Sequence, residues 1–211
     1  MTTILVYGDS NSHGTIPLQR LGQAARFAPQ HRWPAVMADR LGPEIRVIDE
    51  GLPGRTTVHD DPIEGGARNG LAVLPAVLLS HAPLDLLVLM LGTNDLKSRF
   101  SITAWEIARA VERLVVTART ELPGLDIMII APAPVREVGS LKDVFVGAEA
   151  RQSGLTAHLA RVAETQGCGF VDASTHIEVS MVDGVHWEAR AHVSFGTAMA
   201  DLVAARLKGR T

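Results

Sequence analysis

PLDLLVLMLGTND, at residues 83–95, is the most informative stretch of this 211-residue sequence. A strand is expected at residues 84–91, and the run LLVLML within it is continuous rather than alternating, which is typical of a strand covered on both faces, as in a parallel sheet. Four other short apolar runs also look like strands, at residues 3–7, 45–49, 126–131 and 169–172, and IMII in the third of them is again continuous. We therefore predict five strands in one parallel sheet.

Helical patterns separate these runs. Residues 33–41 and residues 103–122 repeat apolar side chains at helical spacing. Thr103 and Glu106 have the spacing of a capping box at the start of the second of these helices. Two further helices are predicted, with glycine stop signals behind them, at residues 154–166 followed by Gly167 and at residues 189–207 followed by Gly209.

The alternation of strands and helices indicates the α/β fold class. Such an order gives an open parallel sheet with right-handed crossovers and helices on both faces. A length of 211 residues suits one domain, and the sequence has no internal repeat or interdomain linker. We expect a three-layer α/β/α arrangement in a single domain that covers residues 1–211.

Composition and charge narrow the class of protein. Apolar residues make up 46% of the chain and charged residues 20%, which indicates a globular protein. The net charge is −3 without a basic cluster, so we expect no nucleic-acid partner. MTTILVYGDS at residues 1–10 has neither the pattern of a signal peptide nor that of a membrane span. With Cys168 as the one cysteine, we expect a cytoplasmic protein, no membrane association and a buried structural thiol.

Three long segments without a clear period follow predicted strands, at residues 11–32, 52–69 and 132–152. They are rich in Gly, Pro and polar residues. In open α/β sheets, ligands bind outside the carboxyl ends of the strands, and long loops there are more often functional than accidental. We therefore expect the functional site at this edge of the sheet.

Two polar motifs lie behind the first and second predicted strands. In GDS, residues 8–10, the serine would face the cleft, and a helix starting there would direct backbone N–H groups toward an anion. In GRTT, residues 54–57, Gly54 can approach a substrate closely and direct an N–H inward. Each motif also has a structural interpretation, a capping turn at Ser10 and a Pro-Gly turn at Pro53 and Gly54.

Two more motifs follow along the chain. In GTND, residues 92–95, the Asn94 side chain can donate to a developing oxyanion, although an Asx-turn is the alternative. In DGVH, residues 183–186, the three-residue spacing would place Asp183 and His186 on one side of a helical turn. The carboxylate can then orient and stabilise the imidazole. With Ser10 as nucleophile, the pair indicates a serine triad.

Together, the four motifs resemble the sequence blocks of SGNH (GDSL-like) hydrolases, in that family's order. The stretches HRWPAVMADRLG, EGLPGRTT and PLDLLVLMLGTND are also similar to a bacterial subgroup of aryl esterases and acyltransferases. The resemblance covers nearly the whole chain and implies a flavodoxin-like five-stranded sheet of order 2-1-3-4-5. It departs at Asn11, where many relatives have leucine.

The resemblance implies a serine esterase that acts through an acyl-Ser10 intermediate. His186 would be the general base and then acid, oriented by Asp183. The oxyanion hole would consist of the backbone N–H groups of Ser10 and Gly54 and the side chain of Asn94. Further side chains are expected to line the substrate cleft, namely Asn11, Leu52, Pro53 and Trp187.

The expected substrates are small-molecule esters with short acyl groups, above all aryl acetates or acetylated sugars. Transfer to an alcohol or peroxide in place of water is possible on the same site. The alternative function is a non-catalytic binding module for acetylated carbohydrate on the same fold. A nucleotide-binding protein is disfavoured, because neither GxGxxG nor a P-loop motif is present.

Cofactors, metals and partners complete the expectations. We expect no cofactor and no metal, because the histidines show neither an HExxH pattern nor a CxxC pair nearby. The related subgroup often forms oligomers, so a homo-oligomer is expected. Residues 136–152 would be either part of an interface or a mobile surface loop.

Overall fold

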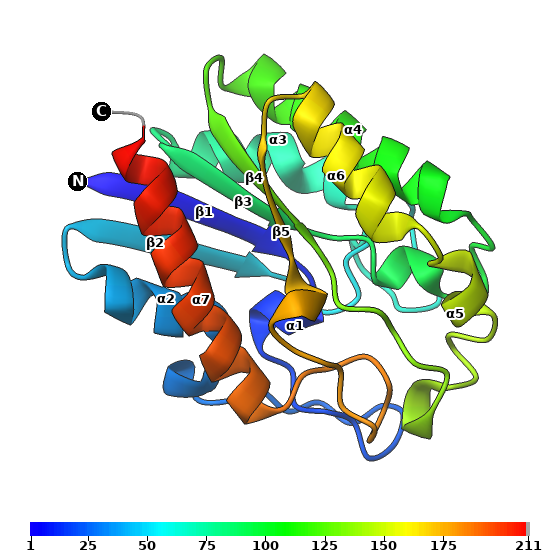
Figure 1. The fold of residues 1–211 in the computed structure, drawn as a ribbon. Coiled ribbons are helices and arrows are strands. Elements are labelled where there is room, and N and C mark those ends of the chain that lie inside the picture. Colours follow the sequence, from blue (N-terminus) through cyan, green and yellow to red (C-terminus); the bar gives the residue numbers. More distant parts are fainter. Residues whose placement is uncertain (210–211) are drawn as a thin grey trace.

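A parallel five-stranded sheet forms the centre of the computed structural model, which describes residues 1–209 (Figure 1). The strand order is β2-β1-β3-β4-β5, and all neighbouring strands are parallel. The strands are β1 (Thr2–Gly8), β2 (Ile45–Gly51), β3 (Leu86–Met90), β4 (Asp126–Ala131) and β5 (Gly169–Asp172). The predicted number, direction and order of the strands are confirmed.

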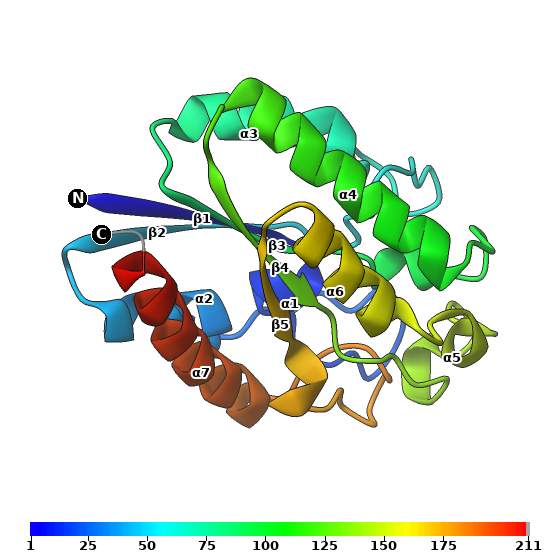
Figure 2. The same ribbon diagram turned by 45° about the horizontal axis from the view of Figure 1, so that its top comes forward.

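Helices cover both faces of this sheet (Figure 2). Helices α2 and α7 pack together on one face, and α3, α4 and α6 cover the other. Their bounds are α2 (Trp33–Leu41), α3 (Gly70–His81), α4 (Ala104–Glu121), α6 (Leu155–Thr165) and α7 (Ala189–Lys208). Two short helices, α1 (Ser10–His13) and α5 (Ala148–Arg151), lie beyond the carboxyl ends of the strands. The expected three-layer α/β/α architecture is confirmed.

Two hydrophobic clusters, one on each face of the sheet, explain the continuous apolar runs. Successive side chains of a strand point to opposite faces. On β1, Leu5 and Tyr7 belong to the cluster beneath α3, α4 and α6. Ile4 and Val6 belong to the cluster that contains Trp33 of α2. All five side chains are fully buried, so β1 has no polar face.

Helix α3 was not among the predicted helices. Its sequence GLAVLPAVLLSH is apolar on almost every side and contains Pro75, so no polar face reveals the helical period. Leu74 and Leu78 face the core, and the Asn69 side chain caps the first turn by accepting from the N–H of Ala72 at 3.2 Å. Burial and this cap stabilise a helix that periodicity alone does not indicate.

The predicted ends of the other helices agree with the structure. The capping box of Thr103 and Glu106 is present at the start of α4. Gly167 has a φ of +61° just behind α6, which suits glycine at a helix end. Gly209 caps α7 in the right-handed region instead. Within residues 1–209, no helix is long and apolar enough to cross a membrane.

Cys168 lies next to β5 and is half-buried, rather than fully buried as expected. It packs against the cluster on the α4 and α6 face. Burial raises the pKa of its thiol, and the nearby Arg119 and Arg206 offset only part of that effect. The protonated thiol is therefore favoured, in keeping with the predicted structural role.

Candidate active site

Three neighbouring strands end together and bring three sequence motifs to one edge of the sheet. Gly8 of β1 is in register with Gly51 of β2 and with Met90 of β3. Helix α1 then lies directly against these ends. A Cβ on Gly8 would lie 2.0 Å from the Ser12 hydroxyl oxygen, and one on Gly51 would lie 2.3 Å from the backbone nitrogen of His13. A side chain at Gly8 or Gly51 would therefore collide with α1, so both strands must end in glycine for α1 to lie where it does.

Ser10 is the first residue of α1, directly behind its N-cap, Asp9. The Asp9 carboxylate accepts from the N–H of Asn11 at 2.9 Å, and this bond fixes the turn that carries the serine. Burial raises the pKa of Asp9 to about 6, although the Asn11 N–H and the His186 and Arg55 charges favour its ionised form. Ser10 itself is 5% exposed and lines a cavity.

The DGVH motif forms a turn rather than the helical turn we expected. One oxygen of the fully buried Asp183 accepts from the backbone N–H groups of Val185 and His186, both at 2.9 Å. The other accepts from the N–H of Leu18 at 2.7 Å and pairs with His186 Nδ1 at 2.6 Å. The two side chains therefore do meet, through a carboxylate that is saturated with donors.

Electrostatics keeps this carboxylate ionised. Burial alone raises the pKa of Asp183, but the hydrogen bond and charge of His186 and the N–H groups of Leu18 and His186 outweigh it. The net pKa is below the usual value for aspartate. Because Asp183 bonds Nδ1, the other ring nitrogen, Nε2, is left to act toward the cavity that His186 lines.

The opposite side of the cavity presents three donors. Gly54 has a φ of +81°, which suits glycine. Within residues 1–209, the N–H groups of Ser10 and Gly54 donate to no protein acceptor. Asn94 uses one amide hydrogen for the carbonyl of Arg55 at 3.1 Å, and the second has no partner among the described residues. All three residues line the same cavity, so their free donors can stabilise a negatively charged oxygen there.

Asp95 braces these donors by joining two of the motifs. Its buried carboxylate accepts from the N–H of Thr57 at 3.0 and 3.1 Å and from the Thr57 hydroxyl at 2.5 Å. Arg55 adds a second brace, because its guanidinium donates to the carbonyls of Gly8 and Glu50 and lies 4.0 Å from the Tyr7 ring centroid. Sequence reasoning missed the supporting role of Asp95.

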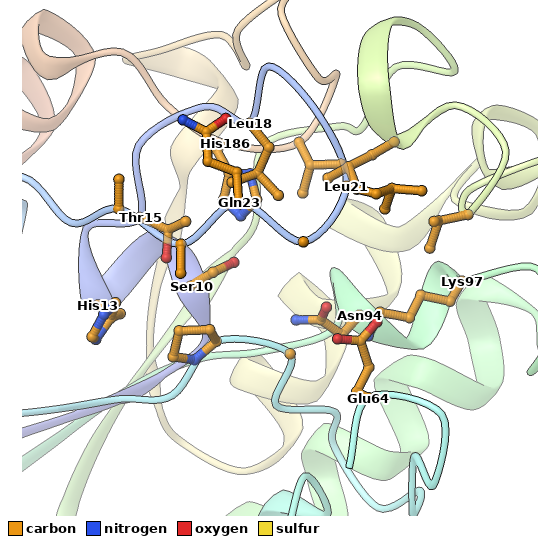
Figure 3. A pocket seen from close by; sticks show the side chains of 18 of the residues that line it. Ser10, His13, Thr15, Leu18, Leu21, Gln23, Glu64, Asn94, Lys97 and His186 are labelled. Carbon is orange, nitrogen blue, oxygen red and sulfur yellow. The ribbon is translucent and has the colours of Figure 1, made fainter.

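The cavity has a volume of about 460 Å³ and extends well beyond Ser10 (Figure 3). Figure 3 shows the Ser10 hydroxyl and the Asn94 amide directed toward the same space, with His186 on its other side. Of the predicted cleft residues, Pro53 lines the cavity. Sequence reasoning missed most of its apolar wall, which consists of Leu18, Leu21, Leu141, Val144, Phe145 and Val185.

Three predicted cleft residues do not line this cavity. Trp187 is 1% exposed and packs in the core against Phe195, with ring centroids 5.1 Å apart. Asn11 is buried, and its amide donates to the carbonyl of Val185 at 3.2 Å, which ties the Ser10 turn to the His186 turn. Leu52 precedes Pro53 but does not line the cavity. An apolar residue near a motif gives no sign of whether it faces cleft or core.

Residues 136–152 form one wall of the cavity through Leu141, Val144 and Phe145. The segment is tied down at both ends. Glu137 and Glu149 each accept the other's backbone N–H at 3.0 Å, and Gln152 bonds both the N–H and the carbonyl of Val135 at 2.9 Å. A fixed wall fits these contacts better than the mobile loop considered from the sequence.

The histidines and acidic residues outside the triad do not gather into a metal site. In the part of the chain that the structure describes, no group of three or more His, Cys, Asp or Glu side chains could hold a metal ion. His192 is fully buried, and burial lowers its pKa to about 3, so it is neutral. Asp61 is buried and pairs with Lys97 and Arg99.

Solved structures similar to this chain are esterases. A carbohydrate acetylesterase from Sinorhizobium meliloti is 34% identical, with a TM-score of 0.92, over 97% of this chain and 99% of that one. A carbohydrate acetylesterase family member from the same organism is 36% identical, with a TM-score of 0.91, over 99% and 100%. The M. smegmatis aryl esterase is 33% identical, with a TM-score of 0.90, over 97% and 99%. No curated protein sequence matches the chain.

A family model agrees with these likenesses. The GDSL-like lipase/acylhydrolase model matches residues 6–208, which include all four motifs. The resemblance drawn from the motifs is therefore confirmed, as is the expectation of an enzyme. The chain belongs to the GDSL-like lipase/acylhydrolase family, with the SGNH hydrolase fold, and is a carboxylic ester hydrolase.

Proposed function

We propose that the protein hydrolyses short-chain esters, above all acetyl esters of phenols or sugars, through an acyl-Ser10 intermediate. The observation that carries this proposal is the pairing of His186 Nδ1 with Asp183 at 2.6 Å. His186 lines the same cavity as Ser10 and the three donors that have no acceptor within residues 1–209. The acetylesterase and aryl esterase names of similar structures support the substrate class. As an ester hydrolase, the protein gives no support to the binding-module alternative.

In the first half of the reaction, the ester acylates Ser10. His186 Nε2 takes the hydroxyl proton while Ser10 Oγ attacks the carbonyl carbon. The carbonyl oxygen becomes an anion that accepts from the N–H groups of Ser10 and Gly54 and the Asn94 amide. The intermediate then collapses, the bond to the alcohol oxygen breaks, and His186 gives its proton to the leaving alcohol.

The second half regenerates Ser10. His186 takes a proton from a water molecule, whose oxygen attacks the acyl carbon, and the same donors again hold the oxyanion. Collapse breaks the bond to Ser10 Oγ, which receives the proton from His186, and releases the carboxylic acid. An alcohol in place of water gives a new ester. The apolar cavity wall favours this transfer to the extent that it excludes water.

Hydrolysis of p-nitrophenyl acetate tests the proposal. Wild-type protein should release p-nitrophenolate, and Ser10→Ala should abolish nearly all of this activity with the fold intact. Ser194→Ala, on the exposed side of α7, is the matched control and should retain wild-type rates. Equal activity in the Ser10→Ala variant would refute the acyl-Ser10 mechanism. Adding an alcohol and analysing the products would then measure acyl transfer.

A further inference from the structure

Arg68 is a charged side chain of the cavity wall without a counter-ion. It lies on the loop between β2 and α3 and lines the cavity. A Cβ on Gly54 would lie 3.0 Å from its Nε and 3.2 Å from its Cδ, so Arg68 packs directly on the glycine whose N–H faces the cavity. Its Nε is buried without a hydrogen-bond partner, and no carboxylate of residues 1–209 lies within 4.0 Å of its guanidinium.

The other charged side chains that line the cavity are paired. Arg26 lies 3.2 Å from Asp49. Lys97 lies 2.9 Å from the buried Asp61 and 3.3 Å from Glu64. Figure 3 shows Glu64 and Lys97 next to each other beside Asn94. Arg68 is therefore the exception among the Arg, Lys and Glu residues of this wall.

Glu64 is a carboxylate near Arg68, because its Oε2 would lie 3.7 Å from the same Cβ on Gly54, but it forms no ion pair with Arg68. One of its oxygens pairs with Lys97, and the same oxygen lies 3.8 Å from Arg99. On the far side of Ser10, His13 adds no second positive charge. Its pKa is lowered by burial and by the charges of Arg26 and Arg32, so the neutral ring is favoured. Within residues 1–209, the Arg68 guanidinium next to Gly54 therefore takes part in no ion pair.

We propose that Arg68 binds a carboxylate group on the substrate, so that the natural esters of this protein are anionic. The planar guanidinium forms strong paired hydrogen bonds with carboxylates, and water exclusion from the cavity strengthens their attraction. The inference rests on the proposed function, because it assigns the substrate class of the same site. Arg68 adjoins Gly54, so the carboxylate must lie within a few bonds of the ester carbonyl.

Two pairs of esters test this proposal, each differing only in one charge. The first pair is 3-acetoxybenzoate and its methyl ester, which place the charge on the alcohol part. The second is 4-nitrophenyl hydrogen succinate and its methyl ester, which place it on the acid part. The quantity measured is the ratio of kcat/KM for the anionic ester to that for its neutral partner, after subtraction of the uncatalysed rate. The proteins are wild type, Arg68→Met, Arg68→Lys and the control Arg161→Met on the exposed side of α6.

The wild-type ratio should exceed that of Arg68→Met by about tenfold or more in at least one pair, as loss of a charged hydrogen bond predicts. The pair that responds identifies the part of the ester that Arg68 binds. Arg68→Lys should retain part of the preference, and Arg161→Met all of it. Ratios that are equal in wild type and Arg68→Met for both pairs would overturn the inference. Failure of wild type to hydrolyse any of the four esters would instead count against the proposed function.

Discussion

The two sides of the cavity differ in how fully their hydrogen bonds are used. On the His186 side, the Asp183 carboxylate accepts from three backbone N–H groups and from the imidazole. On the opposite side, within residues 1–209, the N–H groups of Ser10 and Gly54 have no protein acceptor. Buried polar groups normally find partners. The first side is therefore complete in the free protein, and the second is completed only by a ligand oxygen.

This difference corresponds to two kinds of chemical work. A base must hold one orientation and one tautomer throughout, which a saturated carboxylate provides. An oxyanion hole must hold its donors ready for a charge that exists only during the reaction. The predictions below disturb one side or the other, in order of decreasing effect.

Removal of the nucleophile or the base has the largest expected effect. Ser10→Ala and His186→Ala should each lower kcat by about 10⁴-fold or more, because the hydroxyl and the imidazole act as one unit. For the same reason, the double variant should be hardly slower than either single one. Steady-state rates on p-nitrophenyl acetate measure this, and additive losses in the double variant would contradict it.

Asp183→Asn disturbs the complete side without removing the base. Its oxygen can still accept from the N–H groups of Val185 and His186, but its amide would face the N–H of Leu18 and ring nitrogen Nδ1. The imidazole would then favour the wrong tautomer, and kcat should fall by about 10³–10⁴-fold. A variant with near wild-type kcat would show that this carboxylate does not orient the base.

Asn94→Ala removes one donor from the incomplete side. A loss of about 10²–10³-fold in kcat is expected, with a smaller change in KM, because the donor acts mainly on the oxyanion. Steady-state kinetics on aryl acetates separate the two parameters. A rise in KM with unchanged kcat would indicate that Asn94 binds the substrate rather than the transition state.

Asp95→Asn tests the brace behind the donors and should cost less, about tenfold in kcat. In the variant, one oxygen can still accept from the N–H and the hydroxyl of Thr57. The NH2 group that replaces the second oxygen would face the same N–H, which that oxygen accepts at 3.0 Å, so the Gly54 turn would be less well placed. A misplacement near 1 Å is enough for such a loss. The pH profile should keep its wild-type shape, since the base is untouched, and an altered profile would contradict a positioning role.

Asp9→Asn should change stability rather than chemistry. Burial raises the pKa of Asp9 from 3.8 to about 6, so between these values the folded state binds more protons than the unfolded state. The free energy of unfolding therefore falls by on the order of 3 kcal/mol as pH rises from 4 to 6. Asp9→Asn has no carboxyl to titrate, so its free energy of unfolding should not show this decrease. Urea unfolding at pH 4 and pH 7 measures it against the exposed Asp39→Asn. If the free energy of unfolding changed with pH in the same way in Asp9→Asn and Asp39→Asn, the raised pKa of Asp9 would be refuted.

Much of this molecule could be predicted from its sequence, because its signals are local. Strands without a polar face gave the parallel sheet, and the three long segments behind them proved to line the cavity. Helix α3 escaped prediction because it has no polar face either. Continuous apolar runs thus indicate the buried strands, whereas helical spacing indicates a helix only where the helix has a polar face.

The cavity wall shows the limit of the same approach. Leu141, Val144 and Phe145 reach the cavity because residues 136–152 are anchored by long-range bonds to Val135 and Leu96. Trp187 turns into the core because it packs against Phe195. Both outcomes depend on contacts between distant segments, which spacing along the chain does not encode. Homo-oligomer formation and cytoplasmic location stay predictions.

Covalent labelling of the serine tests the central claim most directly. A fluorophosphonate reports both a nucleophile and its base, because the reaction requires the Ser10 hydroxyl to be activated by His186. Mass spectrometry should find one adduct per chain, on the peptide that contains Ser10, with very slow labelling in His186→Ala and none at this peptide in Ser10→Ala. Rapid labelling of Ser10 that is independent of His186, or an adduct on another residue in its place, would contradict the account.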